Sequence, residues 1–213
     1  MKSSSVPVLL GLLALGACAH SQASPSAAGG LTADARINIA AAAQASGDSA
    51  TALTLLAGAA QSAPQRADVQ QSYARALADA GQTQRAAGVL EAALRANPGN
   101  RRLTYEQARL QLLTGDGAGA LALLNALLQV EPHDPVALTA RGVALDLTGD
   151  AAAAQDSYRQ ALAVAPNSAA AHNNLAISLL LQGNRSESKT ELERARAQEN
   201  APARVSNNLA FLQ

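Results

Sequence analysis

The sequence predicts an all-α solenoid of about five tandem helix-turn-helix units with a further helix capping its C-terminal end. The first observation is a proline every 34 residues, at Pro64, Pro98, Pro132 and Pro166. The second is a glycine at the same spacing, at Gly47, Gly81, Gly115, Gly149 and Gly183. Two kinds of helix-breaking residue that share one period indicate a single structural unit repeated in tandem. The third is composition: 48% of the residues are hydrophobic but only 2% are aromatic, which favours closely packed alanine-rich helices over a β-sandwich.

The prolines also set the boundaries of the units. With proline at position 32, the units are 33–66, 67–100, 101–134, 135–168 and 169–202. Positions 8, 20 and 27 carry mostly alanine, so two helices can approach closely there, and position 24 carries leucine or tyrosine. Glycine at position 15 can adopt the positive φ that ends a first helix. Proline at position 32 ends the second helix, because it cannot continue the hydrogen-bond pattern.

Short polar residues stand where each helix is expected to begin, and their side chains can accept hydrogen bonds from the free amides of a first turn. The expected caps of first helices are Thr32, Asn100, Asp134 and Ser168. The expected caps of second helices are Asp48, Asp116, Asp150 and Asn184. Gly117 and Gly119 lie in the opening turn of the second helix of unit 101–134. Each costs about 1 kcal/mol relative to alanine, so we expect this unit to be the least stable.

This pattern of small, bulky, glycine and proline positions resembles the tetratricopeptide repeat (TPR) over residues 33–213. The resemblance implies a right-handed TPR solenoid that binds protein or peptide ligands on its concave surface. The sequence departs from the family at position 4, where tryptophan is usual. That position holds Arg36, Gln70, Thr104, Leu138 and His172.

Residues 203–213 begin the repeat pattern once more, as a sixth first helix without a second helix. Val205, Leu209 and Leu212 recur at i, i+4 and i+7, which places them on one helical face. A solenoid needs a covering element over its last interface. We therefore predict that residues 203–213 form a capping helix.

The resemblance further implies that positions 2, 5, 6, 9, 12 and 13 of the first helices line the concave surface. The candidate partner-binding residues are Arg75, Tyr105, Arg109, Leu112, Leu113, Val143, Asn173, Asn174, Ile177, Leu180, Arg204, Asn207, Asn208 and Phe211. Asn174 and Asn208 share position 6, where amides can pair with both groups of a bound peptide backbone. Alternatively, they cap or connect adjacent helices. Arg204 is a candidate for holding a carboxylate.

The N-terminus has the pattern of an export signal. Lys2 precedes an apolar stretch of about ten residues, which fits the central part of a secretory signal. Leu15-Gly16-Ala17-Cys18 resembles a bacterial lipobox, which implies that residues 1–17 are a signal peptide and that Cys18 is acylated. Residues 18–32 then form the anchor and a flexible linker. Alanine at position 19 implies sorting to the outer membrane, with the protein facing the periplasm.

Two alternatives remain for this segment. Ala17-Cys18-Ala19 also fits an ordinary cleavage site that would release a soluble periplasmic protein beginning at His20. In the second alternative, Cys18 is a small buried hydrophobic residue.

Charge and residue chemistry argue against several other classes of protein. The 16 basic and 16 acidic residues balance, without the basic cluster that nucleic-acid binding needs. Ser186-Glu187-Ser188-Lys189 matches the Ser-x-x-Lys pattern of penicillin-recognising enzymes, but the partner motifs are missing. His20, His133 and His172 are isolated, whereas zinc needs three or four converging ligands. We therefore expect no enzymatic activity, no cofactor or metal, no nucleic acid and no small-molecule substrate.

The last unit carries a narrower resemblance. Asn174-Leu175-Ala176, a Gln-Gly turn, Ala201-Pro202-Ala203-Arg204-Val205 and Asn208-Leu209-Ala210 resemble the TadD family of tight-adherence (Flp) pilus lipoproteins. This implies an outer-membrane scaffold that acts in pilus or secretion-system assembly, with the pilus secretin as a partner. The alternatives are a type IV pilus pilotin, an accessory of outer-membrane protein insertion, or a docking module for peptidoglycan enzymes.

Overall fold

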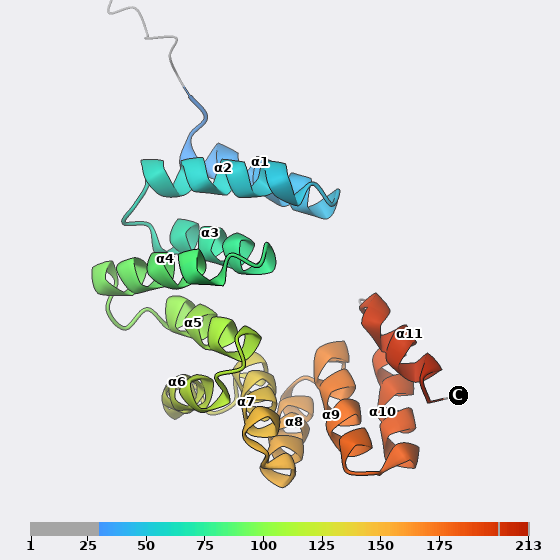
Figure 1. The fold of residues 1–213 in the computed structure, drawn as a ribbon. Helices are drawn as coiled ribbons and strands as arrows, with labels where there is room; N and C mark the ends of the chain where they lie inside the picture. The colour runs from blue at the N-terminus through green and yellow to red at the C-terminus, as the bar shows by residue number, and fades with distance from the viewer. Residues whose placement is uncertain (1–29, 200, 213) are drawn as a thin grey trace, which may run out of the picture. The chain divides into compact units, whose positions relative to one another are not determined.

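The computed structural model describes residues 30–199 and 201–212, and the regular structure in these ranges is entirely α-helical. The helices are α1 (Ala33–Ala45), α2 (Ser49–Ser62), α3 (Ala67–Asp79), α4 (Thr83–Ala96), α5 (Arg101–Leu113), α6 (Gly117–Val130), α7 (Pro135–Thr148), α8 (Ala151–Val164), α9 (Ala169–Leu181), α10 (Arg185–Arg196) and α11 (Ala203–Ala210) (Figure 1). The predicted all-α fold is confirmed. The proposed signal peptide, Cys18 and most of the proposed linker lie outside the described residues.

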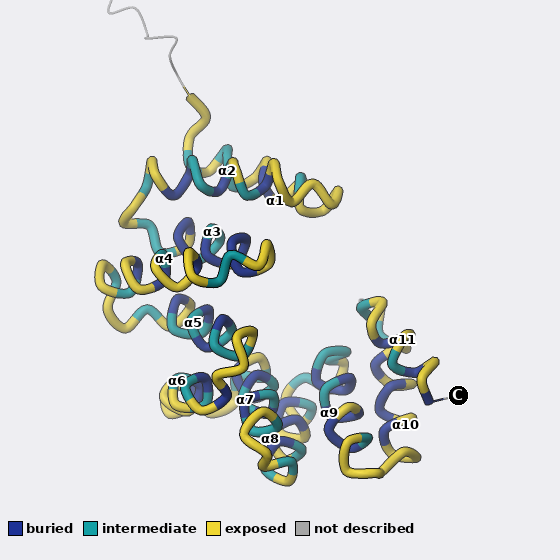
Figure 2. Tube along the Cα trace, in the orientation of Figure 1, coloured by how far each residue is buried: buried dark blue, intermediate teal, exposed yellow. Residues whose placement is uncertain are grey.

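Each first helix packs against the second helix of its own unit, and each second helix packs against the first helix of the next. The odd-numbered helices α1, α3, α5, α7 and α9 also contact one another in sequence. Buried residues recur along the helices (Figure 2). The first helices therefore form one continuous row, and that row is the surface on which the sequence places the candidate binding residues.

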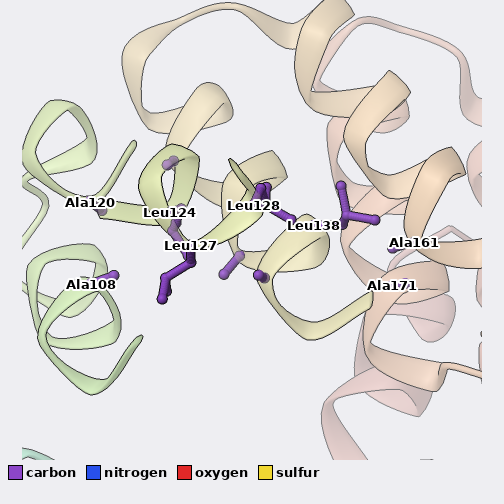
Figure 3. Close-up of a cluster of buried hydrophobic side chains, with 11 residues drawn as sticks. Ala108, Ala120, Leu124, Leu127, Leu128, Leu138, Ala161 and Ala171 are labelled. Atoms are coloured by element: carbon purple, nitrogen blue, oxygen red, sulfur yellow. The ribbon is translucent and has the colours of Figure 1, made fainter. Parts of the chain in front are cut away.

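One hydrophobic cluster illustrates how the units are joined. It extends from Ala108 of α5 through Leu124, Leu127 and Leu128 of α6 to residues of α7, α8 and α9. Figure 3 shows the three leucines between Ala108 on one side and Leu138, Ala161 and Ala171 on the other. Because a single cluster includes side chains from three successive units, the units support one another across their interfaces, as in other repeat proteins.

The turns follow the local signals in the sequence. The five periodic glycines have φ between +74° and +89°, the left-handed region that glycine enters without steric cost. The helices α2, α4, α6 and α8 each end two residues before their proline. In contrast, α10 ends at Arg196, and its unit has Asn200 at the proline position.

Seven of the eight expected caps are present as side-chain hydrogen bonds. The accepting residues are Thr32, Asp48, Asn100, Asp116, Asp134, Asp150 and Ser168. The expectation for Asn184 was wrong in one respect: the residue occupies the N-cap of α10, but its side chain makes no capping bond there.

Polar side chains at position 4 replace the packing that tryptophan supplies in the family. Arg36 Nη1 donates to the carbonyl of Gly58 on α2 at 2.6 Å, and Gln70 Nε2 donates to the carbonyl of Ala60 at 3.0 Å. His172 is buried, with Nδ1 2.6 Å from Glu191 Oε2 and Nε2 2.9 Å from the carbonyl oxygen of Pro166. These contacts join neighbouring helices, and His172 thus connects α9 to α10 and to the turn before α9.

The capping helix covers the last unit as predicted. Val205, Leu209 and Leu212 are buried, and they share a cluster with Ala176 of α9 and with Leu192 and Ala195 of α10. α11 therefore closes the apolar interface that the unit 169–202 would otherwise expose.

Gly117 has a packing role that the sequence analysis did not anticipate. A Cβ atom at this position would lie 2.8 Å from Leu147 Cβ and 3.0 Å from the carbonyl oxygen of Ala144, both on α7. The glycine thus permits close contact between α6 and α7. The lower stability expected of unit 101–134 stays a prediction.

In unit 135–168, the residue at position 8 is smaller and the facing residue at position 24 is larger than in the other units. Four units pair alanine at position 8 with leucine at position 24, whereas this unit pairs Gly142 with Tyr158. A Cβ on Gly142 would lie 2.6 Å from Tyr158 Cζ. The Tyr158 hydroxyl donates to Asp146 Oδ2 at 2.8 Å, and Ser178 donates to Asp146 Oδ1 at 2.8 Å. Burial and the bond to Asp146 raise the pKa of Tyr158 above its ordinary value, so Tyr158 keeps its proton and links α8 to α7.

Gly142→Ala is therefore expected to destabilise the protein by about 1–3 kcal/mol, because the added methyl overpacks the interface. Tyr158→Leu added to it recreates the alanine–leucine pair of the other units. In urea denaturation, we expect the double variant to lose less stability than the sum of the two single variants by about 1 kcal/mol or more. Additive losses would contradict this account.

Ser188 has a buried hydroxyl that lacks a partner. Its residue is 0% exposed, and its Oγ has no hydrogen-bond partner among the described residues. The other four units have alanine at this position, 20. A buried polar group without a partner costs about 1–3 kcal/mol.

Ser188→Ala is expected to raise the free energy of unfolding by about 1 kcal/mol or more, because it removes this unpaired hydroxyl. Ser186→Ala on the exposed side of α10 is the matched control, since it carries the same difference in helix propensity. Equal gains from the two variants in urea denaturation would show that the buried hydroxyl carries no cost.

Candidate functional site

The first helices form a hollowed surface at the positions that the family resemblance indicated. A cavity of about 690 Å³ lies along α3, α5 and the start of α7. Gln71 and Tyr105 line it from position 5, and Arg102 and Val136 from position 2. A second cavity of about 250 Å³ is lined from α1 and α3, and it includes Gln71 and Arg75. Gln71 lines both cavities, which are therefore neighbours on the first-helix row, and the larger one is named the recess.

Four alternating charges link the first helices α3 and α5. The Glu106 carboxylate accepts from Arg75 Nη2 at 2.7 Å and from Arg109 Nε at 2.6 Å. Arg109 Nη1 also lies 3.2 Å from Asp79 Oδ1. The Glu106 side chain is 2% exposed, whereas that of Arg75 is 47% exposed. Glu106 thus joins the two helices α3 and α5 by holding both arginines.

This network changes the interpretation of two candidate residues. Arg75 and Arg109 lie on the first-helix row as expected, but both are held by Glu106, which the sequence analysis did not single out. The hydrogen bond to Glu106 raises the pKa of Arg75, so its guanidinium stays charged. Its Nη1 has no hydrogen-bond partner in the described part of the chain. Arg75 therefore keeps one donor group for a ligand.

The asparagines form a chain between α9 and α11. Asn208 Nδ2 donates to Asn173 Oδ1 at 2.8 Å, and Asn173 Nδ2 is 3.2 Å from Asn174 Oδ1. Asn173 is buried, and the other two are half-buried. The Asn208–Asn173 bond joins α11 to α9, as in the alternative interpretation in which asparagines connect adjacent helices, whereas the Asn173–Asn174 contact lies within α9. The Asn174 amide nitrogen and the Asn208 carbonyl oxygen make no side-chain hydrogen bond within the described ranges, so these two atoms remain for the expected pairing with a peptide backbone.

The apolar candidate residues differ in how far their side chains are exposed to solvent. Phe211 and Ile177 are 75% and 39% exposed, and Leu113 is 54% exposed. Val143, Leu112 and Leu180 are half-buried against hydrophobic clusters. Arg204 and Asn207 are exposed on α11. Phe211, Ile177 and Leu113 are therefore the residues of this set with apolar area to offer a partner.

Several residues of the recess were missed in the sequence analysis. Gln71, Arg102 and Val136 line the recess from positions 2 and 5. Outside the recess, the exposed leucines Leu147 and Leu181 at position 13 were also missed. The same positional rule would have found all of them. What the rule does not provide is which of these side chains remain free once neighbouring units pack.

Within residues 30–199 and 201–212, no cluster of three or more His, Cys, Asp or Glu residues is placed to hold a metal ion. In the same ranges, no helix combines the length and apolar character that crossing a membrane requires.

The chain is similar to known repeat proteins in sequence and in fold. Residues 77–142 and 147–210 match one tetratricopeptide-repeat family model, and residues 28–101 match a second. No curated protein matches the chain significantly.

Solved structures with the same fold cover most of the chain. The thermophilic TPR protein TTC0263 of Thermus thermophilus is 19% identical, with a TM-score of 0.77 over 85% of this chain and 98% of its own. MamA (41-end) of Desulfovibrio magneticus RS-1 is 21% identical, with a TM-score of 0.61 over 82% and 98%. The APC/C hetero-tetramer Cut9–Hcn1 is 16% identical, with a TM-score of 0.74 over 85% of this chain and 36% of that one.

At these identities the structural likeness concerns the fold alone, but the family models match well over half of the sequence. The period, the eleven helices of the described residues and the row of first helices agree with those matches. The chain belongs to the tetratricopeptide-repeat family, and its repeats form a scaffold for protein–protein interaction.

Proposed function

We propose that this protein is a cell-envelope lipoprotein that holds a protein partner along the row of its first helices. The observation that carries the proposal is the recess of α3, α5 and α7, where charged and aromatic side chains surround a cavity of about 690 Å³. On the same helices α3 and α5, the buried Glu106 holds Arg109 and Arg75, and Arg75 lines the smaller neighbouring cavity. This part of the row is therefore ordered before a partner arrives. Preorganised surfaces bind with a lower entropic cost.

The C-terminal half of the row offers a different chemistry. Ile177, Leu181 and Phe211 expose apolar area there, and Asn174 and Asn208 lie on the same helices. Exposed apolar residues beside amides suit a segment with hydrophobic side chains and a backbone to pair with. We propose that a partner segment extends along both halves.

The anchor is the second part of the proposal. Cys18 follows an apolar segment within Leu15-Gly16-Ala17-Cys18, and acylation of this thiol would tether the repeats to a membrane. One acyl chain gives reversible binding, whereas two or more give stable anchoring. The alanine after Cys18 supports the outer membrane, with the repeats in the periplasm.

The biological setting that we favour is assembly of a tight-adherence pilus or a related secretion system, with the pilus secretin as partner. Support comes from the TadD-like residues of the last unit, which include Asn208-Leu209-Ala210 of the capping helix. The alternatives are a type IV pilus pilotin, an accessory of outer-membrane protein insertion and a docking module for peptidoglycan enzymes. Tetratricopeptide-repeat proteins are typically scaffolds without catalytic activity, and no enzymatic role is proposed.

Site-specific photo-crosslinking in cells tests the partner. A photoreactive amino acid at Tyr105 or Ile177 is expected to form a covalent adduct with a partner protein, because both residues lie on the first-helix row. The same amino acid at Arg159, exposed on the second helix α8, is the control.

Mass spectrometry of the adduct separates the candidate functions. A secretin at Tyr105 and Ile177 supports the favoured role, and a peptidoglycan hydrolase supports the docking module. Adducts at Arg159 alone would contradict binding on the first-helix row. Normal assembly of secretin multimers in a deletion strain would exclude the pilus role.

Cys18→Ala tests the anchor. The wild-type chain is expected to incorporate an alkyne-labelled fatty acid and to fractionate with the outer membrane, because the acylated thiol partitions into lipid. The variant is expected to lose the label and the membrane association together. A labelled variant, or an unlabelled wild-type chain released into the periplasm, would contradict the anchor.

A further inference from the structure

Arg141 of α7 is a charged residue at a position where the other units have uncharged side chains. It occupies position 7, which holds Ile39, Tyr73, Gln107 and Leu175 in the other four units. The Arg141 side chain is half-buried. A charge that is partly removed from water is unfavourable unless another group compensates for it. The groups around Arg141 therefore decide whether the chain itself supplies that compensation.

The hydrogen bonds that hold Arg141 are made to uncharged groups. Arg141 Nε donates to the Ser157 hydroxyl at 3.1 Å, and Nη2 donates to Gln160 Oε1 at 3.2 Å, both on α8. Ser157 is buried, and its hydroxyl donates in turn to the carbonyl of Ala153 at 2.8 Å. These bonds fix the orientation of the guanidinium without adding a negative charge. Among the described residues, Arg141 forms no ion pair and its Nη1 has no hydrogen-bond partner.

A cavity of about 470 Å³ lies beside this guanidinium, lined by residues of α6, α7 and α8. Asn125 and Gln129 line it from successive turns of α6, and His133 follows in the turn before α7. Neither Asn125 nor Gln129 makes a side-chain hydrogen bond to another residue that the structure describes. Gln160 also lines the cavity, and its Nε2 stays free because Arg141 uses only its Oε1. The wall thus combines one fixed positive charge with several unused amide donors.

The charge of this cavity is not balanced by acidic groups. No aspartate or glutamate contributes to its wall in the described part of the chain. The acidic residues nearest in sequence are engaged elsewhere: Glu131 pairs with Arg101, Asp134 caps α7, and Asp156 pairs with Arg159. In the recess on the first-helix row, by contrast, two basic and two acidic residues balance. The cavity beside Arg141 therefore carries a net positive charge.

We propose that this cavity binds a phosphate group, either free phosphate or the phosphate of an organic ester such as a lipid headgroup. Arg141 Nη1 donates to one phosphate oxygen, and the amides of Asn125 and Gln129 donate to the others. A phosphate carries up to two negative charges, so an uncompensated cation attracts it more strongly than it attracts a carboxylate with one. Leu128 and Val164 in the same wall contact the organic part of an ester. The site shares no lining residue with the recess, so it is independent of the partner proposed there.

Binding of small anions to the full-length chain in a non-ionic detergent tests this inference. The probes are inorganic phosphate, glycerol 3-phosphate as a soluble headgroup analogue, and acetate, each added at constant ionic strength. Isothermal titration calorimetry measures the affinities. Phosphate is also expected to raise the thermal midpoint more than chloride does at the same ionic strength, because a ligand of the folded state stabilises it.

Two variants change the cavity in different ways. Arg141→Gln introduces the residue that unit 101–134 carries at position 7, Gln107, so the variant is expected to fold. Gln129→Glu adds a negative charge to the wall and leaves both bonds of Arg141 in place. Each variant should bind phosphate about tenfold or more weakly, the loss expected of a hydrogen bond to a charged group. Gln61→Glu is the matched control, because Gln61 is exposed at the same repeat position on α2, and its affinity should equal that of the wild type.

The three probes distinguish the sources of the phosphate. Tighter binding of glycerol 3-phosphate than of inorganic phosphate supports an ester such as a lipid headgroup, and the reverse order supports free phosphate. Acetate bound as tightly as phosphate would overturn the assignment to phosphate. Stabilisation no greater than that by chloride, or an unchanged phosphate affinity in both cavity variants, would overturn the site.

Discussion

Close contact between helix backbones is the constraint on which the rest of this structure depends. The residues at positions 8, 20 and 27 are buried in all five units, and all except Leu127 are alanine, glycine or serine. Where one residue of a facing pair is larger, the other is smaller: Tyr158 faces Gly142. Dense packing leaves little free volume for a side chain of the wrong size. The side chains of each unit therefore have to fit both within the unit and against the neighbouring units.

Tight packing also determines how polar residues are accommodated. Arg36, Gln70 and His172 occupy the place where the family has tryptophan, and each reaches a carbonyl or carboxylate of a nearby helix or turn. Buried polar groups have to find partners, because an unpaired one costs about 1–3 kcal/mol. The polar replacements therefore connect helices by hydrogen bonds where the family uses an aromatic side chain.

The polar side chains of the first-helix row fall into two sets. Those of one set are paired with another residue of the protein, and those of the other set are not. Arg75, Arg101 and Arg109 are paired with acidic residues of the chain, whereas Arg102 is not. The asparagines of α9 and α11 use part of their amide groups to join these helices. A partner is recognised by the groups that remain, so the internal contacts of the scaffold set its binding chemistry as directly as its surface residues do.

The sequence by itself determined the period, the helix ends and the capping helix. These features depend on local chemistry: positive φ at glycine, the missing amide of proline, and short polar side chains at N-caps. The repeat register also places Tyr105 at the recess and Arg75 at the smaller cavity beside it. Each of these inferences needs only the neighbouring residues or the repeat register.

The tertiary structure alone decided which side chains meet across units. Asn208 bonds to Asn173 and not to Asn174, which is 34 residues away. Arg75 meets Glu106 at a separation of 31 residues, and Ser178 meets Asp146 at 32. Side chains of adjacent first helices therefore meet at separations of 31, 32 and 35 residues, and not at the repeat length of 34. The period predicts the helices, whereas the charge that is left without an acidic partner at Arg141 is visible only once the units are packed.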